Sequence, residues 1–308
     1  MAEGIDGLQR LSGGASQETW TFRTRGGAPE WLILRRSPEG ARSGVPGIGM
    51  AAEAQVITRA AAAGVPVPCI LHELTPADRA GSGFIMPRIE GETLPPRIFR
   101  NEAFAPARQR FAFQAGEILA AIHRIDPQGL AIPAQTPLEG VEDLRKRHAA
   151  CETARPVFSL ALRWLQDNAP EPGRPRLVHG DFRMGNLMMG PEGIRAVLDW
   201  ELAHTGDPLA DLGWLCMESW RFGRRDPVGG LGSREDLLAG YAAADGAPVD
   251  AAALRWWEVL AALRWGVIIE EMGGWVLSGA DRSVERHVIA RRASETEAIL
   301  LLNMLETE

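Results

Sequence analysis

The sequence predicts an α+β chain of two lobes, in which a small antiparallel β-sheet with one helix precedes a larger, mostly helical lobe. Three observations lead to this prediction. The first ninety residues carry strand patterns, the residues after Glu90 and Gly91 carry helix patterns, and 308 residues can form one large domain or two ordinary ones. We therefore expect lobes over residues 1–91 and 92–308, with a ligand cleft between them.

Five short strands and one helix are expected in the first lobe. Residues 19–23 alternate polar and apolar side chains, and residues 31–35 form an apolar run that ends in charge. The alanine-rich segment 50–63 favours a helix, which Gly64 ends. The remaining strands are expected at residues 8–11, 70–74 and 84–88.

The second lobe carries six helix patterns and two short apolar strands. The strands are expected at residues 176–178 and 194–198, between the second helix and the third. The helices are expected at residues 104–125, 142–168, 208–222, 234–244, 250–276 and 282–305.

Charge and cysteine content exclude several classes of function. A net charge of -7, from 33 basic and 40 acidic residues, argues against nucleic acid or an anionic membrane as the main partner. The segment 259–277 is too interrupted by charges to cross a membrane, and the amino terminus lacks the pattern of a signal peptide. Three scattered cysteines without metal-binding spacing indicate a reduced, cytoplasmic chain. The oligomeric state is not predicted.

The most informative segment runs from Leu177 to Glu201. His179 and Asp181 precede Asn186 at the spacing of a kinase catalytic loop, and Asp199 follows an apolar strand. Phosphoryl transfer needs hard oxygen ligands for Mg²⁺, which Asn186 and Asp199 can supply. It also needs a carboxylate that orients and deprotonates the attacking hydroxyl, a role open to Asp181.

These residues carry a family resemblance. The HGDxxxxN motif at 179–186, the LDWE motif at 198–201 and the segment 206–212 resemble the aminoglycoside phosphotransferase family of kinase-like small-molecule phosphotransferases. The nearest branch is the one associated with acyl-CoA dehydrogenases. The resemblance implies a protein-kinase-like bilobal fold, with Mg²⁺ and ATP as the phosphoryl donor and a hydroxyl group as the acceptor.

The resemblance also implies roles for single residues of this segment. Asp181 matches the catalytic aspartate, and Asn186 and Asp199 match the metal ligands. Arg183 lies where protein kinases often have a lysine that contacts phosphate. Asp211 matches a carboxylate that braces the catalytic loop, and we expect His179 to support the loop through hydrogen bonds rather than to act as an acid or base.

The amino-terminal lobe is expected to bind the nucleotide. The family places a phosphate-covering loop between the first two strands, where this chain has a flexible run whose candidate binding residues are Ser12, Gly13, Gly14 and Ser16. Taken alone, such a run is more often an ordinary hairpin turn. The segment 84–91 matches the hinge between the lobes, where Arg88 and Ile89 would offer main-chain groups to the adenine.

A kinase normally carries a lysine on its third strand, paired with a glutamate on the helix. Lys146 is the one lysine of this chain and falls in the second lobe, whereas Arg35 ends the third expected strand. We therefore expect Arg35 and Glu53 to replace that pair, since a guanidinium can hold phosphate with two parallel hydrogen bonds. Arg36, on the opposite face of the strand, is the alternative.

Candidates for substrate contact lie on the long helix expected at 250–276. Trp257, Arg264, Glu271 and Trp275 share one helical face, and the family binds its acceptor among the carboxy-terminal helices. An interior ion pair between the two charged members is an equally open interpretation. Glu201 is a further candidate from the LDWE motif, and His123 is expected to be structural.

Three functions remain open. The leading hypothesis is a Mg-ATP-dependent kinase of a small hydroxylated molecule. A catalytically weak nucleotide-binding homologue is the second, because the strand-three lysine is missing. A metal-dependent hydrolase is the third, and its ligands would be His179, Asp181, Asp199, Glu201 and His204. Sugars, aminoglycosides, macrolides, amino alcohols and hydroxyacyl thioesters all remain possible acceptors.

Overall fold

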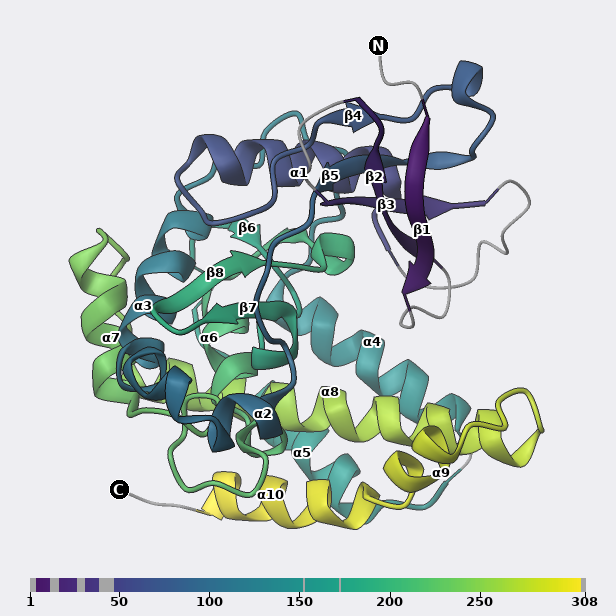
Figure 1. Cartoon of the computed structure of the whole chain (residues 1–308). Helices are drawn as coiled ribbons and strands as arrows, with labels where there is room; N and C mark the ends of the chain where they lie inside the picture. The colour runs from purple at the N-terminus through teal and green to yellow at the C-terminus, as the bar shows by residue number, and fades with distance from the viewer. Residues whose placement is uncertain are drawn as a thin grey trace.

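The structure of the chain is a computed structural model. It describes residues 4–11, 17–26, 31–38, 47–151, 153–171 and 173–305. The expected phosphate-covering residues Ser12, Gly13, Gly14 and Ser16 lie outside these ranges. A strand-rich lobe occupies the upper part of the molecule and a helical lobe the lower part, as the sequence predicts (Figure 1).

The upper lobe is built on one antiparallel sheet whose strand order is β1-β2-β3-β5-β4. Its one α-helix among the described residues is α1 (Met50–Ala62), and a 3₁₀ turn, η1, spans Pro76–Asp78. β4 has only two residues, so the expected strand 70–74 is much shorter than predicted. The strands are β1 (Ile5–Leu11), β2 (Glu18–Thr24), β3 (Trp31–Ser37), β4 (His72–Glu73) and β5 (Ser82–Pro87).

The register of the central strands gives the sheet a face toward the lower lobe. Ile33 of β3 lies opposite Met86 of β5, and Arg35 lies opposite Phe84. Because side chains alternate along a strand, these four residues share one face, while Arg36 points to the other. That face therefore carries three apolar side chains and one cation.

The lower lobe contains two small antiparallel sheets among its helices. One pairs β6 (Arg176–Val178) with β9 (His204–Gly206), and the other pairs β7 (Leu187–Gly190) with β8 (Gly193–Val197). The helices are α2 (Pro95–Arg100), α3 (Ala105–His123), α4 (Pro137–Ala150), α5 (Pro156–Asp167), α6 (Leu209–Cys216), α7 (Arg234–Ala243), α8 (Ala251–Leu277), α9 (Val284–Ala290) and α10 (Ala293–Leu305). The 3₁₀ turns are η2 (Glu102–Phe104), η3 (Met184–Asn186), η4 (Trp200–Leu202) and η5 (Glu218–Arg221).

Three expected helices are interrupted. The helix expected at 142–168 is α4 and α5, because Pro156 can begin a helix but disfavours helical geometry at the residue before it. The helix expected at 208–222 ends at Cys216, where Met217 turns to an extended ψ of 140°. The helix expected at 282–305 is α9 and α10. The sequence patterns also missed α2, β7 and β9.

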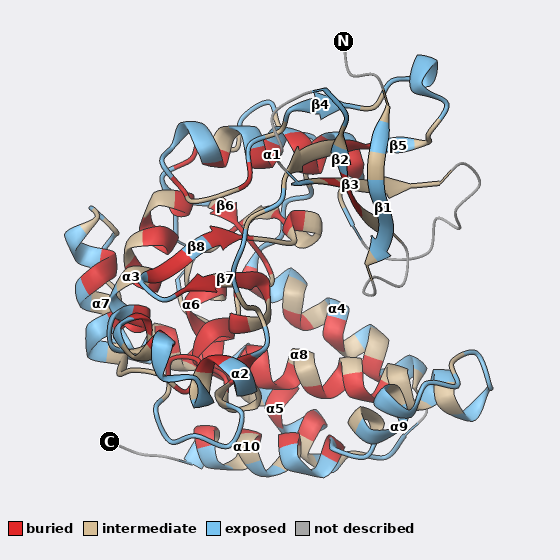
Figure 2. Cartoon of the chain, viewed as in Figure 1, coloured by how far each residue is buried: buried red, intermediate tan, exposed pale blue. Residues whose placement is uncertain are grey.

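The hydrophobic core continues from one lobe into the other. One cluster joins Ile57 of α1 and Phe84 of β5 to Leu119 of α3 and Trp200 of η4, and a second fills the space between α4, α5 and α8. Buried residues concentrate along these elements in Figure 2. Backbone hydrogen bonds also join the lobes, from Val197 N to Pro66 O at 2.7 Å and from Ile48 N to Glu201 O at 3.0 Å.

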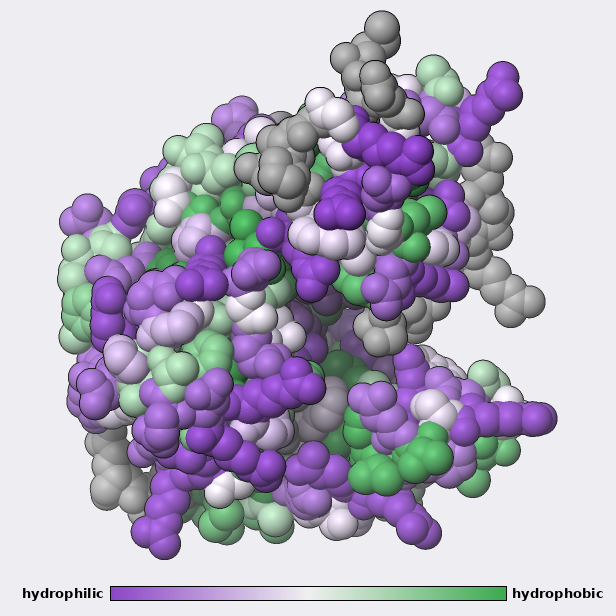
Figure 3. Space-filling view, viewed as in Figure 1, coloured by the Kyte–Doolittle hydropathy of each residue, from purple (hydrophilic) through white to green (hydrophobic). Residues whose placement is uncertain are grey.

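A deep notch separates the lobes on the surface (Figure 3). Two cavities lie along it, one of about 660 Å³ beneath the sheet and one of about 300 Å³ between α4, α6 and α8. Within the described ranges, no helix combines the length and the apolar content that crossing a lipid bilayer requires.

Candidate active site

The loop between β6 and η3 holds the first three residues of the HGDxxxxN motif. Gly180 adopts a φ of 82°, in the region that favours glycine. A Cβ at this position would lie 2.4 Å from the Leu202 carbonyl oxygen, so any side chain would push the loop away from η4. The glycine therefore allows the loop to pack closely against the segment that follows Asp199.

Asp211, at the start of α6, fixes the backbone of this loop. Its carboxylate accepts hydrogen bonds from the amides of His179 at 2.8 Å and Gly180 at 2.9 Å, and it contacts His123 Nε2 at 3.2 Å. Burial alone would raise the pKa of Asp211, but His123 and the other hydrogen bonds lower it overall. The brace implied by the resemblance is present, and His123 takes part in it.

His179 supports the loop from inside the core. Its Nε2 donates to the Leu198 carbonyl oxygen at 3.1 Å, and its Nδ1 accepts the Asp181 amide at 3.2 Å. Burial lowers the pKa of the imidazole. A neutral ring with a proton on Nε2 satisfies both contacts, which agrees with the structural role expected for this residue.

Three side chains hold the Asp181 carboxylate. Oδ1 accepts from Trp214 Nε1 at 2.8 Å and from Arg183 Nε at 3.1 Å, while Oδ2 accepts from Asn186 Nδ2 at 2.6 Å. Sequence reasoning missed Trp214, which comes from α6, because no spacing rule connects an indole to an aspartate 33 residues earlier. Arg183, the expected phosphate contact, also stacks over Trp220 at 4.8 Å.

The β7–β8 hairpin brings Asn186 and Asp199 to one wall of the larger cavity. Leu187 pairs with Val197, and the Leu198 amide donates to the Asn186 carbonyl oxygen at 2.8 Å. Asp199 then turns with φ 66°, which is uncommon for a residue with a side chain. The two expected metal ligands thus flank the base of one hairpin.

These two side chains fit Mg²⁺. The Asn186 amide nitrogen donates to Asp181, so the side-chain oxygen is the atom that remains for a cation. One carboxylate oxygen of Asp199 faces Arg35 at 2.6 Å, and the other is not part of that contact. Mg²⁺ usually takes one or two protein oxygens and completes its shell with phosphate and water, which matches this donor set.

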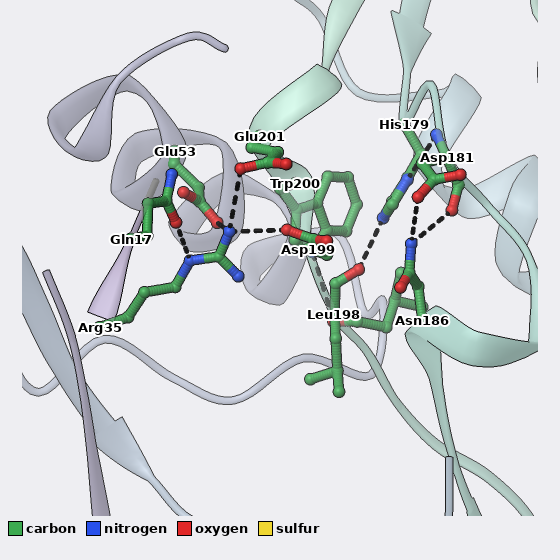
Figure 4. A network of polar contacts seen from close by, with 11 residues as sticks. Gln17, Arg35, Glu53, His179, Asp181, Asn186, Leu198, Asp199, Trp200 and Glu201 are labelled. Atoms are coloured by element: carbon green, nitrogen blue, oxygen red, sulfur yellow. Dashed lines mark hydrogen bonds and ion pairs between the residues drawn. The ribbon is translucent and has the colours of Figure 1, made fainter. Parts of the chain in front are cut away.

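Arg35 meets the acidic side of the cavity (Figure 4). Its Nη2 lies 2.6 Å from Asp199, 3.4 Å from Glu53 and 3.5 Å from Glu201, and its Nε donates to Gln17 at 2.6 Å. Burial alone would lower the pKa of Arg35, but the three carboxylates, Glu53 first, raise it. The expected Arg35–Glu53 pair is present, within a larger network that the sequence did not suggest.

Glu53 is the most buried member of this network, with 1% of its surface exposed. Neither carboxylate oxygen forms a well-aligned hydrogen bond among the described residues, although Arg35 Nη2 lies 3.4 Å from one of them. Burial raises the pKa of Glu53 to about 7, in spite of Arg35. Arg36 is directed away from the cavity and pairs with Glu18 at 2.8 Å, so it does not replace Arg35.

The hinge residues Arg88 and Ile89 also line the larger cavity. The Arg88 amide donates to the Trp31 carbonyl oxygen at 2.8 Å, and its guanidinium lies 5.9 Å from the Trp31 ring. Both the amide and the side chain of Arg88 are therefore engaged with the sheet, so the main-chain contact expected at the hinge stays a prediction that depends on the Arg88 carbonyl oxygen and on Ile89.

The expected substrate face of α8 is divided. Trp257 and Arg264 line the smaller cavity together with Glu201. Glu271 instead forms two hydrogen bonds with Arg147 of α4, at 2.8 and 2.7 Å, so the alternative of an Arg264–Glu271 pair is wrong. Trp275 is 43% exposed at the far end of the helix and does not line this cavity.

The ligand set of the hydrolase hypothesis does not converge. His179 Nε2 is directed at the Leu198 carbonyl oxygen, and His204 Nδ1 at that of Leu202, at 3.0 Å. In the part of the chain that the structure describes, no three His, Cys, Asp or Glu side chains gather closely enough to hold a metal ion.

Comparison with a family model matches residues 7–261 to a group described as the phosphotransferase enzyme family. Mouse acyl-CoA dehydrogenase family member 10 is 32% identical over 228 residues, which are 68% of this chain and 20% of the relative. Chicken acyl-CoA dehydrogenase family member 11 is 31% identical over 221 residues, which are 67% of this chain and 27% of the relative. The chain thus matches only a minor part of each relative's length.

Solved structures share the fold. A putative aminoglycoside phosphotransferase from Ralstonia eutropha has a TM-score of 0.75 at 21% identity, with 98% of this chain and 94% of that chain covered. A spectinomycin phosphotransferase in complex with ADP and spectinomycin has a TM-score of 0.64 at 14% identity, with 97% and 93% covered. A thermostable mutant of an aminoglycoside phosphotransferase, in ternary complex with ADP and hygromycin B, has a TM-score of 0.64 at 18% identity, with 98% and 96% covered.

Proposed function

This chain belongs to the phosphotransferase enzyme family, and on that premise we propose that it transfers the γ-phosphoryl group of ATP, with Mg²⁺, to a hydroxyl of a small molecule. The observation that carries the proposal is the convergence of Asn186, Asp199 and Arg35 on the larger cavity, with the Asp181 carboxylate hydrogen-bonded to Asn186. We place the lobe boundary near residues 91 and 92, at the end of the hinge.

In this proposal the larger cavity binds the nucleotide. Its volume and its apolar wall of Ile33, Phe84 and Met86 suit an adenine ring, and the main chain at Arg88 and Ile89 suits the ring's polar edge. Arg35, which lies opposite Phe84 in the sheet, suits the phosphates. The described residues thus provide an apolar wall and a cation in one cavity, and residues 12–16 are proposed to cover the phosphates.

Asp181 is the proposed catalytic base. Its carboxylate orients the acceptor hydroxyl and takes its proton, while the hydroxyl oxygen bonds to the γ-phosphorus and the bond from that phosphorus to the β–γ bridging oxygen breaks, so that ADP leaves. Arg183 stabilises charge on the transferred group. Mg²⁺, held by Asn186 and Asp199, would neutralise charge on the phosphate oxygens.

The relatives suggest where to look for the acceptor. Their names place a match to this chain within acyl-CoA dehydrogenase family members, so hydroxyacyl thioesters join sugars, aminoglycosides, macrolides and amino alcohols as compounds to test. The three free cysteines suit a reducing compartment, and a cytoplasmic location is part of the proposal.

The decisive experiment measures ADP release from Mg-ATP over a library of hydroxyl compounds, together with ADP binding by calorimetry. Asp181→Asn removes the base but keeps the shape of the side chain, so we expect ADP to bind as in the wild type while ADP release falls by about 10²–10⁴-fold. Asp167→Asn, which changes an exposed aspartate of α5 that pairs with Arg163 and lies outside both cavities, is the matched control.

Three outcomes are distinguishable. Full turnover by Asp181→Asn with an acceptor that the wild type uses would contradict the assigned base. ADP binding without turnover on any compound would favour the catalytically weak homologue, and failure to bind ADP would overturn the proposed function as a whole.

A further inference from the structure

Two hydrogen-bond donors of α8 line the smaller cavity without an acidic partner. Trp257 and Arg264 are seven residues apart, which places them two turns apart on one face of the helix. The indole Nε1 of Trp257 is buried and has no hydrogen-bond partner among the described residues. A buried donor without a partner is unusual in a folded protein. Because the Trp257 side chain lines the cavity, a ligand oxygen that reaches this nitrogen would gain a hydrogen bond that the protein does not supply.

Arg264 is held in place by neutral groups. Its Nη1 donates to the Gly180 carbonyl oxygen at 3.0 Å, and its guanidinium stacks over the Trp214 ring at 4.6 Å. Within the described ranges no carboxylate forms an ion pair with it. Burial lowers the pKa of Arg264, and Asp181 offsets this only in part. Because a guanidinium stays charged in proteins, this cation is desolvated without full compensation.

The other charged side chains of the cavity wall are already engaged. Burial lowers the pKa of His204, so this residue adds no positive charge at neutral pH. The remaining pairs and caps are Asp143 with Arg147 at 3.4 Å, Arg147 with Glu271 at 2.7 Å, Glu201 with Arg35 at 3.5 Å, and Asp207 with the Leu209 amide at 2.9 Å. Arg264 is thus the cation of this wall that has no charged partner among the described residues, and Asp207 is the carboxylate that has none.

We propose that the phosphoryl acceptor is a small hydroxylated anion, whose carboxylate or phosphate group binds Arg264 and the Nε1–H of Trp257. The inference rests on the proposed function and names the substrate class for the same site. Arg264 contacts Gly180, the residue before Asp181, so an anion bound there holds a hydroxyl a few bonds away near the catalytic base. A cavity of about 300 Å³ suits a small metabolite.

Matched pairs of probes test the charge requirement. The ADP-loaded protein is titrated with 4-hydroxybutyrate against butane-1,4-diol for a carboxylate, and with glycerol 3-phosphate against glycerol for a phosphate. Binding is followed by tryptophan fluorescence and calorimetry, because Trp257 and Trp214 adjoin the proposed site. We expect the anion of at least one pair to bind about tenfold tighter or more than its neutral counterpart. Whichever pair shows the preference identifies the anionic group.

Variants assign that preference to the two donors. Arg264→Gln should remove it, Arg264→Lys should keep part of it because the charge remains without the planar fork, and Trp257→Phe should weaken anion binding. Arg255→Gln is the control, since Arg255 lies on the same helix but donates to the Asn303 carbonyl oxygen, away from this cavity. It should bind both members of each pair as the wild type does.

The inference and the proposed function fail in different ways. If ADP binds but neither anion binds better than its neutral counterpart, or none of the four probes binds, the anion site is wrong while the kinase assignment stands. If Arg264→Gln keeps the full preference in a folded protein, the site is elsewhere. If ADP does not bind, the failure is that of the proposed function.

Discussion

Nη2 of Arg35 lies 2.6 Å from Oδ1 of Asp199, although Arg35 belongs to β3 of the upper lobe and Asp199 follows β8 of the lower lobe. Both residues line the larger cavity, so the contact joins the two lobes at its wall. It also joins the residue proposed to hold phosphate to a residue proposed to hold the metal, so a change at either one is expected to affect nucleotide binding.

Removal of the Arg35 side chain is the first prediction. Arg35→Ala should weaken ADP binding in the presence of Mg²⁺ by about 10–100-fold, the range expected for loss of charge-assisted hydrogen bonds. Calorimetry measures this directly. The ADP affinity of Arg35→Lys should lie between those of Arg35→Ala and the wild type, because the positive charge remains but the planar guanidinium is lost.

Arg36→Ala is the matched control for that experiment, since Arg36 is the next residue of β3 and pairs with Glu18 on the other face. It should bind ADP as the wild type does. Equal ADP affinity for Arg35→Ala and the wild type would show that this guanidinium does not hold the nucleotide.

The second prediction concerns the indole that holds Asp181. Trp214→Phe removes the hydrogen bond from Nε1 but keeps a ring beneath Arg264, so the rate of ADP release should fall about tenfold while the ADP affinity stays unchanged. Trp164→Phe, a change in α5 away from the site, should leave both values unchanged. A Trp214→Phe protein with the wild-type rate would mean that Arg183 and Asn186 suffice to position the carboxylate.

The third prediction tests the brace of the catalytic loop. Asp211→Asn keeps the shape of the side chain but removes the negative charge that two backbone amides and His123 share. Loss of a buried charged partner typically costs about 3 kcal/mol, which corresponds to a fall in melting temperature of roughly 6 °C for a chain of this size. Thermal unfolding followed by circular dichroism measures the fall.

Asp207→Asn provides the comparison for Asp211, because Asp207 is partly exposed and its carboxylate accepts only backbone amides, that of Leu209 at the start of α6 and that of Gly173. Asp207→Asn should lower the free energy of unfolding by about 1 kcal/mol. If the two variants unfold at the same temperature, the carboxylate of Asp211 is not a special support of the loop.

The sequence motifs predicted those features of the site that depend on residues close in sequence or on the register of one strand. The loop, the two candidate metal ligands of the hairpin and the Arg35–Glu53 pair all follow from spacing or from alternation along β3. The structure brings Asn186, Asp199, Arg35 and Glu53 to one cavity, with Asp181 hydrogen-bonded to Asn186. The roles of these residues remain predictions, because the geometry shows where they lie rather than what they do.

The parts that the sequence could not predict depend on how helices pack. The contact of Trp214 with Asp181 requires α6 to lie beside the loop, and the pairing of Glu271 with Arg147 requires α4 to lie beside α8. Of the four residues expected on one substrate face of α8, Trp257 and Arg264 line a common cavity. However, Trp257 and Trp275 are 18 residues apart, about 27 Å along the helix axis, so one small cavity cannot reach both.

The fourth prediction is a pH dependence of stability that originates at Glu53. Its pKa is about 7 in the folded protein, raised by burial, whereas an unfolded glutamate titrates near 4.5. Between these two values the folded protein retains a proton that the unfolded chain has released. The contribution of Glu53 is therefore fully present below pH 4.5, declines as the pH rises, and is lost above pH 7.

Glu53→Gln removes this titration and keeps a neutral side chain of the same shape. The free energy of unfolding of the variant, relative to that of the wild type, should therefore rise steadily between pH 4.5 and 7 and stay level above that, as measured by urea denaturation at several pH values. Glu18 gives a contrast of opposite sign, because a hydrogen bond from Arg36 lowers its pKa, so its contribution is lost as the pH falls. If the curves of Glu53→Gln and the wild type run parallel from pH 4.5 to 7, Glu53 is ionised throughout this range and adds a negative charge to the Arg35 network.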